Sequence, residues 1–491
     1  MESLIQIVDK LKQPELRMLR GFYKIKQNKE PSKKLELLNL ITRDKVKTDS
    51  EAMERLYGGS NSVSGFSHLK ERLKTDLLNT ILFLHPEKIY STLFIKNKLE
   101  CRKLIIQAEL LLNRSDIKIS NDILLKALAI AEKFEFPDLE IQIRDTLRAK
   151  KGFEFKFEDF HEHNKRIETC IKLQSAILKS KEYYYYIQYL NSTNTPNHLE
   201  YENFVLNALT EIKQFIEDTK SVQIKYWYYL VAVPFYISTK KDHEQGIKLQ
   251  LEFIKLIEKE VSIRSKSAIG GTNMQLAHIY LVTNDYTKAL KPALKAVENF
   301  RKDSFNYLRA LEFLFWTYFR TGDLVAAEST IENALNHKYI NRSPHFSAKW
   351  KYLKANLMFL KGDLEAAHDY LLQSDELTKD KGGWYIGFKL LLIYITFEQE
   401  NYYWLESQLE NFRKLIARNK QANLKRAKVI HKVAHTLLQN HGDFQRAQEL
   451  SQRELSLLSN AEKDMEWDPT GYEVVRFDDW FNKKKLNITS K

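Results

Sequence analysis

A two-helix pattern that recurs in the second half of the chain limits the fold more than any other sequence feature. Its clearest copy occupies residues 273–300, where two apolar stripes with helical spacing flank the polar pair Asn284-Asp285. The residues of the first stripe are Leu276, Ala277 and Tyr280. The residues of the second stripe are Tyr286, Ala289, Leu290, Ala293 and Ala296. Because many of these residues are alanines, the pattern predicts two closely packed helices joined by a tight turn.

The same order of features returns further along the chain. The clear copies contain Tyr318, Asp323, Ala327 and Ala334, and then Asp363 and Ala367. The weaker copies contain Asn401-Tyr402 with Leu405, and Gly442-Asp443-Phe444 with Ala447. The turn residues recur roughly every 40 residues, which is typical of helical repeat proteins. Those turn residues are Asp285, Asp323, Asp363, Asn401 and Asp443.

The spacing resembles that of the tetratricopeptide (TPR) repeat. Small Ala277 is followed by aromatic Tyr280, then by Ala289 and a closing Ala296. The resemblance covers Tyr226 to Leu458, about half of the chain, with an interval longer than the usual TPR period of about 34 residues. It implies an all-α fold, namely a right-handed α-solenoid of TPR-like helix hairpins with a helical N-terminal region.

The composition agrees with an all-α chain. Glycine and proline number only 15 and 9 among 491 residues, which disfavours a fold of many short strands and turns. The formal net charge of +13 favours nucleic acid or an acidic peptide as a partner. Because 64 acidic residues are interspersed with the 77 basic ones, the alternative is that the excess mainly serves solubility.

We expect four regions along the chain. Residues 1–98 form a helical N-terminal domain, and residues 99–220 contain degenerate helical repeats. Residues 221–463 contain the TPR-like repeats, and residues 464–491 form a C-terminal capping tail.

The tail differs from the repeats because it is rich in aromatic residues. The turn signal Asp468-Pro469-Thr470-Gly471 ends the preceding helix, and disorder is expected from Lys483 onward. The apolar residues expected to cover the open end of the repeats are Tyr472, Val475, Phe477, Trp480 and Phe481. The alternative is that the tail is a docking motif for a partner.

The N-terminal region shows a second resemblance. A short helix ending at Tyr57, a break at Gly58-Gly59-Ser60 and a basic helix over residues 66–81 resemble the helix-turn-helix of bacterial regulators that carry TPRs. This resemblance implies that the DNA-facing residues are Ser67, His68, Lys70 and Lys74. A capping helical bundle is the alternative, because Glu71 and Asp76 would lie close to the phosphates.

No motif in the sequence indicates catalysis. The spacings typical of phosphate-binding loops, metalloproteases, nucleophile elbows and zinc fingers are absent. His161 and His163 fall on nearly opposite sides of a helix and cannot bind one metal ion together. Gly270-Gly271 is interpreted as a helix end before the helix that starts at Asn273. We therefore predict a protein that is not an enzyme and has no cofactor or metal.

Cysteine usage and hydropathy bear on location. Cys101 and Cys170 belong to no paired motif and are interpreted as packing thiols. The first residues, MESLIQIVDKLKQPEL, mix charged with apolar side chains and indicate an amphipathic helix instead of a signal peptide. The apolar runs at 227–237 and 388–397 are shorter than the roughly 20 residues that span a bilayer. We expect a cytoplasmic protein without a membrane partner.

The TPR resemblance also implies where a ligand would bind. In that family, fixed positions of the first helix of each repeat line a concave groove. The matching residues are His278, Arg309, Glu312, Trp316, Phe319, Arg320, Tyr352, Asn356, Phe359 and Tyr394. Aromatic side chains there would bury apolar groups, while Arg and Asn would hold a peptide backbone or a carboxylate. The alternative is that the aromatic residues of this set only pack the helices together.

Two functions agree with these patterns. The first is a non-enzymatic scaffold that binds a protein or peptide in the groove of a TPR-like solenoid. The alternative is a DNA-binding transcriptional regulator with an N-terminal helix-turn-helix and a TPR-like sensor domain. Salt separates them, because DNA binding weakens steeply as the salt concentration rises.

Overall fold

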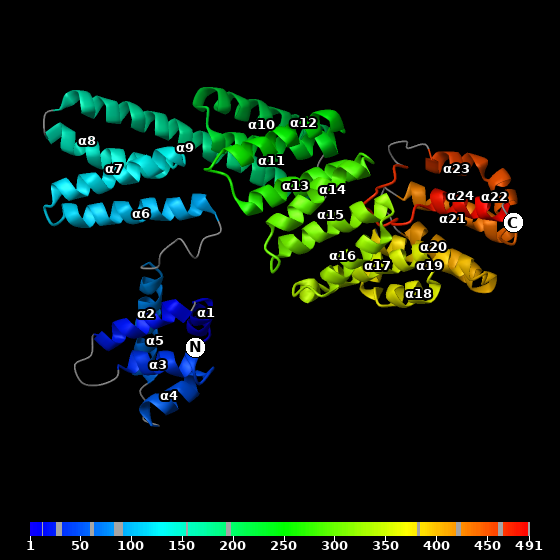
Figure 1. Ribbon diagram of the computed structural model, residues 1–491, viewed down its shortest axis with the longest axis horizontal. Helices are drawn as coiled ribbons and strands as arrows, with labels where there is room; N and C mark the ends of the chain where they lie inside the picture. The colour runs from blue at the N-terminus through cyan, green and yellow to red at the C-terminus, as the bar shows by residue number, and fades with distance from the viewer. Residues whose placement is uncertain are drawn as a thin grey trace. The chain divides into compact units, whose positions relative to one another are not determined.

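Helices make up the regular secondary structure throughout the part of the chain that is described. The computed structural model describes residues 1–11, 13–25, 32–58, 63–82, 92–153, 156–192, 198–380, 383–418, 424–459 and 465–489. Within these ranges there are 24 α-helices and no β-strand, so the all-α prediction is confirmed for them. The chain divides into two compact units, Met1–Ser91 and Thr92–Lys491, which we describe separately (Figure 1).

The first unit is a small group of helices around one long helix, α5. Its helices are α1 (Glu2–Lys10), α2 (Gln13–Ile25), α3 (Lys33–Thr42), α4 (Asp49–Tyr57) and α5 (Val63–Leu82). Helix α5 contacts α1, α2 and α3. Its Leu73 and Leu77 are fully buried in the same core as Leu37 and Leu38. Gly58 ends α4 with a left-handed backbone, which agrees with the predicted break at this position.

The second unit begins earlier than predicted. Helix α6 (Leu93–Leu112) runs without interruption through residues 98 and 99, where we expected a domain boundary. The boundary between the units lies instead between Ser91 and Thr92. The helices that follow are α7 (Ile117–Lys133), α8 (Pro137–Phe153), α9 (Phe157–Ser192), α10 (His198–Thr219), α11 (Val222–Pro234) and α12 (His243–Lys259).

The repeated two-helix pattern corresponds to successive helices that pack against their neighbours along the chain. These helices are α13 (Lys266–Val282), α14 (Tyr286–Asn299), α15 (Phe305–Thr321), α16 (Leu324–Leu335), α17 (Pro344–Lys361), α18 (Leu364–Leu372), α19 (Trp384–Glu398), α20 (Tyr402–Arg418), α21 (Lys425–Gln439) and α22 (Phe444–Leu450). The last two are α23 (Gln452–Ser459) and α24 (Phe477–Thr489). The largest buried apolar cluster extends from Leu281 in α13 to Phe481 in α24.

Helix α13 corrects one sequence expectation. Gly270 and Gly271 do not end a helix, because both lie inside α13. At Gly270 a side-chain Cβ would come within 3.0 Å of the Phe300 ring. Close packing of the helix against this ring therefore explains a glycine at position 270.

Three turns between paired helices share one local geometry. In each turn, a glycine with a left-handed backbone precedes an aspartate that caps the next helix. These pairs are Gly322-Asp323, Gly362-Asp363 and Gly442-Asp443. Glycine adopts positive φ without steric cost, and the aspartate carboxylate accepts a backbone N–H that would otherwise lack a partner. The helix ends therefore depend on local signals, which is why the sequence located them.

The C-terminal tail, defined here as the described residues 465–489, extends back to helices far earlier in the chain. Its non-helical part, residues 465–476, which we call the extended part, includes a turn at residues 469–470 and reaches α15. The chain then returns as α24, which packs against α22 and α23 (Figure 1). The expected disorder from Lys483 onward is wrong within the described residues, because α24 continues to Thr489. Lys484 forms an ion pair with Glu398 at the end of α19. None of the described helices combines the length and the apolar character needed to cross a membrane.

Candidate functional site

Arg320, one of the residues predicted to bind a peptide, holds the backbone of the tail. Its Nε and Nη2 atoms donate hydrogen bonds to the carbonyl oxygen of Pro469 at 2.9 and 2.6 Å. Its Nη1 atom donates to the carbonyl oxygen of Val474 at 2.8 Å. The guanidinium also lies 4.5 Å from the centroid of the Trp467 ring. Burial lowers the pKa of Arg320 to about 10, so the side chain remains a cation at neutral pH.

Two predicted tyrosines continue this contact along the tail. The Tyr352 hydroxyl donates to the carbonyl oxygen of Tyr472 at 2.7 Å. The Tyr394 hydroxyl makes a longer contact of 3.4 Å with the carbonyl oxygen of Val475. Arg320, Tyr352 and Tyr394 come from α15, α17 and α19. Three helices therefore contribute side chains that bind the backbone of one non-helical segment, residues 469–475, which begins with a turn.

Arg426 on α21 completes this surface. Its Nε and Nη2 atoms donate to the two carboxylate oxygens of Glu473 at 2.6 and 2.9 Å, and Nη2 also donates to Asp478 at 2.9 Å. All three side chains are almost fully buried. Burial alone would lower the pKa of Arg426, but its bonds to Glu473 and Asp478 raise the pKa above the ordinary value. We call Arg320, Tyr352, Tyr394 and Arg426 the tail-binding face.

The helical part of the tail is anchored by aromatic rings. Trp480 stacks on Tyr394 with ring centroids 4.8 Å apart, and its indole N–H donates to Glu398 at 2.9 Å. Phe481 is fully buried, and its ring lies 5.1 Å from that of Phe444 in α22. Helix α24 therefore packs on α22 and α23, while the extended part of the tail reaches α15.

The other predicted groove residues do not contact the tail backbone through hydrogen bonds given by the described structure. Four of them are buried, namely Trp316, Phe319, Asn356 and Phe359. Arg320 lies over the first two rings, 5.2 Å from each centroid. Glu312 is also buried and forms ion pairs with Arg309 at 3.5 Å and Lys349 at 2.6 Å. His278 packs against Phe313, with ring centroids 5.3 Å apart. Among these residues, Trp316 and Phe319 thus lie against Arg320 of the tail-binding face, and Phe359 packs against Tyr394 with ring centroids 6.0 Å apart.

The residues predicted to face DNA lie on α5 in the first unit. Ser67 and His68 are exposed. Lys70 forms an ion pair with Asp49 at 2.5 Å, and Lys74 lies 4.0 Å from Glu71. Both lysines therefore have carboxylate neighbours, which reduces the positive charge that α5 presents to a phosphate backbone.

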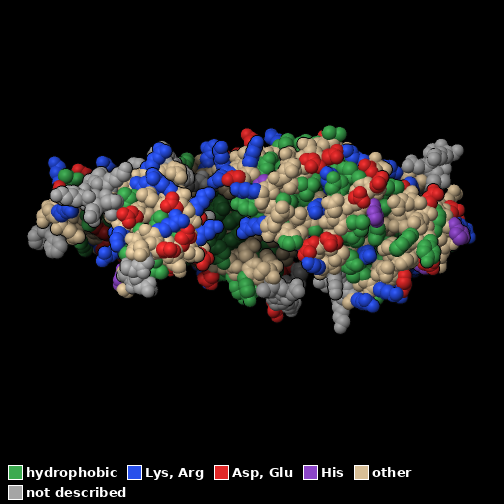
Figure 2. All heavy atoms as spheres, turned by 90° about the horizontal axis from the view of Figure 1, so that it is seen from below, with side chains coloured by type: hydrophobic (Ala, Val, Ile, Leu, Met, Phe, Trp, Pro, Cys, Tyr) green, Lys and Arg blue, Asp and Glu red, His purple; other side chains and the backbone are tan. Residues whose placement is uncertain are grey.

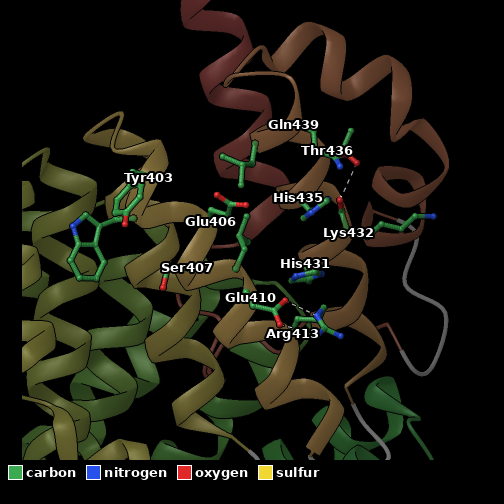
Figure 3. A pocket seen from close by; sticks show the side chains of 13 residues that line it. Tyr403, Glu406, Ser407, Glu410, Arg413, His431, Lys432, His435, Thr436 and Gln439 are labelled. Atoms are coloured by element: carbon green, nitrogen blue, oxygen red, sulfur yellow. Dashed lines mark hydrogen bonds and ion pairs between the residues drawn. The ribbon is translucent and has the colours of Figure 1, made fainter.

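An open pocket of about 1070 Å³ lies between α20 and α21. Glu406 and Glu410 line the α20 wall, and His431 and His435 line the α21 wall (Figure 3). The pocket also includes Tyr403 and Trp404, whose side chains are unusually exposed at 86% and 58%. Exposed aromatic residues of this kind are enriched at protein interfaces, so this pocket is a second candidate contact surface.

Metal ligands, thiols and charged patches are the other features that bear on the chemistry of the described residues. No group of three or more His, Cys, Asp or Glu side chains within them is arranged to hold a metal ion. Cys101 and Cys170 are buried thiols, as interpreted from the sequence. On the face drawn in Figure 2, Lys and Arg side chains are interspersed with Asp and Glu and do not form a field of one sign. This distribution agrees with the interpretation that much of the net charge serves solubility.

Sequence reasoning missed Arg426, Glu473 and Asp478 as a site. One available signal was the position of Glu473 between Tyr472 and Val474, since a carboxylate within an apolar stretch must find a buried partner. The sequence contains no comparable indication that this partner is Arg426. A comparison of the chain with profiles of known protein families and with curated protein sequences gave no match.

Two glycine substitutions test how closely the tail is held. A Cβ at Gly387 in α19 would lie 2.2 Å from the Tyr472 carbonyl oxygen and 2.6 Å from the Tyr352 hydroxyl. We expect Gly387→Ala to lower the free energy of unfolding by about 1–3 kcal/mol through overpacking. The matched control is Gly271→Ala in α13, where nothing lies within 4 Å of the added Cβ. That change is expected to raise stability by about 0.5–1 kcal/mol. Denaturant unfolding of both variants measures the two changes in the free energy of unfolding. Equal changes would contradict the close contact at Gly387.

The stability of the second unit should depend on His278 in mildly acidic solution. Burial holds the pKa of His278 below its usual range; Asp468 opposes this shift and Arg309 reinforces it. The unfolded chain, with a histidine pKa of about 6.5, therefore binds a proton before the folded chain does. Stability is lost as the pH falls from about 6.5 through the lower folded pKa. We expect His278→Gln to reduce this loss in urea titrations from pH 7.5 to 5, whereas the exposed control His68→Gln should leave it unchanged.

Proposed function

We propose that the chain is a non-enzymatic scaffold that binds extended peptide segments of other proteins on its tail-binding face. The single observation that carries this proposal is the position of the tail. Side chains from three helices donate hydrogen bonds to four backbone carbonyl oxygens of the tail, those of Pro469, Tyr472, Val474 and Val475. Hydrogen bonds to the backbone supply affinity without selecting a side chain, and they are one recurring mode of peptide recognition.

The proposal includes the architecture implied by the TPR resemblance, a right-handed solenoid of helix hairpins. It is supported by the sequential packing of α13 to α21 and by the shared Gly-Asp turns. Of the ten groove residues implied by the resemblance, Arg320, Tyr352 and Tyr394 contact the tail directly. In this proposal the tail is the resident occupant of the face, and a partner segment takes its place.

Occupation by the tail sets the affinity that a partner needs. A segment of the same chain is present at an effective concentration in the millimolar range. A separate peptide with the tail sequence would therefore compete poorly with an intact tail. Cutting the chain before the tail removes the high effective concentration while the tail itself remains available for binding.

The test uses a two-piece chain, in which residues 1–464 are co-produced with a separate, fluorescently labelled segment of residues 465–491. We expect the two pieces to co-purify and an excess of unlabelled segment to displace the labelled one, measured by fluorescence anisotropy. Tyr352→Phe removes only one hydroxyl and should weaken binding by about three-fold to ten-fold. The control Tyr185→Phe changes an exposed tyrosine on α9, away from both candidate surfaces, and should have no effect. A labelled segment that no peptide displaces would contradict the proposal, because the tail would then be a fixed part of the fold.

A further inference from the structure

Building on the proposed function, we infer that the partner segment is acidic and aromatic, with two carboxylates that replace Glu473 and Asp478 on Arg426. The Arg426 side chain is only 6% exposed, and the two carboxylates that it meets are 5% and 4% exposed. An isolated guanidinium at this depth is costly, because the protein interior solvates charge poorly. A segment that displaced the tail without bringing carboxylates would leave Arg426 buried without a charged partner, with its hydrogen bond to the carbonyl oxygen of Leu458 still in place.

The spacing of the two acids follows from the conformation of the tail. Glu473 lies in the extended part, and one of its oxygens also accepts the backbone N–H of Phe477 at 2.9 Å, at the start of α24. Asp478 lies in the first turn of α24, where negative charge is favoured. The first acid therefore binds Arg426 and caps a helix at once, and the second acid follows within the next turn. A partner segment needs the same change from non-helical to helical structure.

The aromatic requirement comes from the rings beneath α24. Trp480 stacks on Tyr394 and donates its N–H to Glu398, so it fills a defined site with one polar anchor. Phe477 and Phe481 are fully buried. In the tail these features form the sequence EVVRFDDWF, from Glu473 to Phe481. The ligand class is thus a peptide with an acid, two aliphatic residues, a second acid and closely following aromatic residues.

Space beside the tail gives such a segment a place to begin binding. A cavity of about 610 Å³ lies along the extended part and is lined in part by Arg320, Trp467, Val474 and Arg476. Part of the surface around Arg320 is therefore not covered by the tail. An incoming peptide contacts this region first and then takes over Arg426 as the tail leaves.

The experiment compares competitor peptides on the two-piece chain, so every change is made in the peptide and none in the folded protein. Peptides of residues 465–489 carry the natural sequence, the double change Glu473→Gln with Asp478→Asn, or the single change Asp479→Asn. Asp479 is exposed, which makes its variant the matched control for lost charge. We expect the double variant to need about ten-fold higher concentration, or more, for half displacement, since both lost contacts are charge-assisted hydrogen bonds. The Asp479→Asn peptide should compete like the natural one.

The outcomes separate this inference from the function on which it rests. Equal competition by the natural and doubly changed peptides would overturn the acidic requirement, while peptide binding itself would stand. A loss shared equally by the Asp479→Asn peptide would show a general charge effect and would also overturn it. If even the natural peptide failed to displace the label, the proposed function itself would fail.

Discussion

Removal of residues 468–491 is expected to lower the melting temperature of the second unit by about 10 °C or more. The deletion uncovers Tyr352 and Tyr394, which are 1% exposed in the intact chain, and it leaves Arg426 without its carboxylate partners. It also removes five apolar side chains that are buried, each worth about 1.5–3 kcal/mol. Those side chains are Val474, Val475, Phe477, Trp480 and Phe481.

The deleted chain should also self-associate through the uncovered surface. Circular dichroism melting and light scattering after size-exclusion chromatography measure the two effects. The control is Lys483→Ala, an exposed position on α24, which should change neither. An unchanged melting temperature combined with loss of one binding partner would instead identify the tail as a docking motif.

The second large effect is expected from Arg426→Met. This change removes the guanidinium partner of the buried Glu473 carboxylate, whereas Asp478 keeps its ion pair with Arg476 at 2.7 Å. Breaking a buried ion pair in this way costs about 3–5 kcal/mol of the free energy of unfolding. Urea unfolding measures the loss, and the matched control is Arg413→Met, which breaks the exposed pair with Glu410 on α20. We expect the control to have a much smaller effect because solvent screens exposed pairs.

A triple variant tests the cause of the Arg426→Met effect. Combining it with Glu473→Gln and Asp478→Asn removes all three charges from the buried cluster. Stability should then recover in part, because no charge of this cluster remains fully buried and Arg476, the ion-pair partner that Asp478 loses, is 25% exposed. If the triple variant were as unstable as Arg426→Met alone, the loss would come from packing and not from charge.

The amino-acid sequence alone determined the helices and most of their ends. The Gly322-Asp323 and Gly362-Asp363 turns act within a few residues, through a left-handed glycine and an aspartate cap. Apolar spacing likewise identified α5 and the helices of the repeated pairs. The sequence misplaced the unit boundary and the role of Gly270, because both depend on contacts with residues outside the local segment.

The sequence also selected Arg320 and Tyr352 as peptide-binding residues through their positions in the repeat. Only the tertiary structure decided that their occupant is the tail, since Pro469 lies 149 residues from Arg320 and Tyr472 lies 120 residues from Tyr352. No local pattern specifies such a contact. The sequence did not indicate the partners of Arg426 for the same reason. A buried cation must be paired, but the fold decides that Glu473 and Asp478 are the carboxylates that meet it.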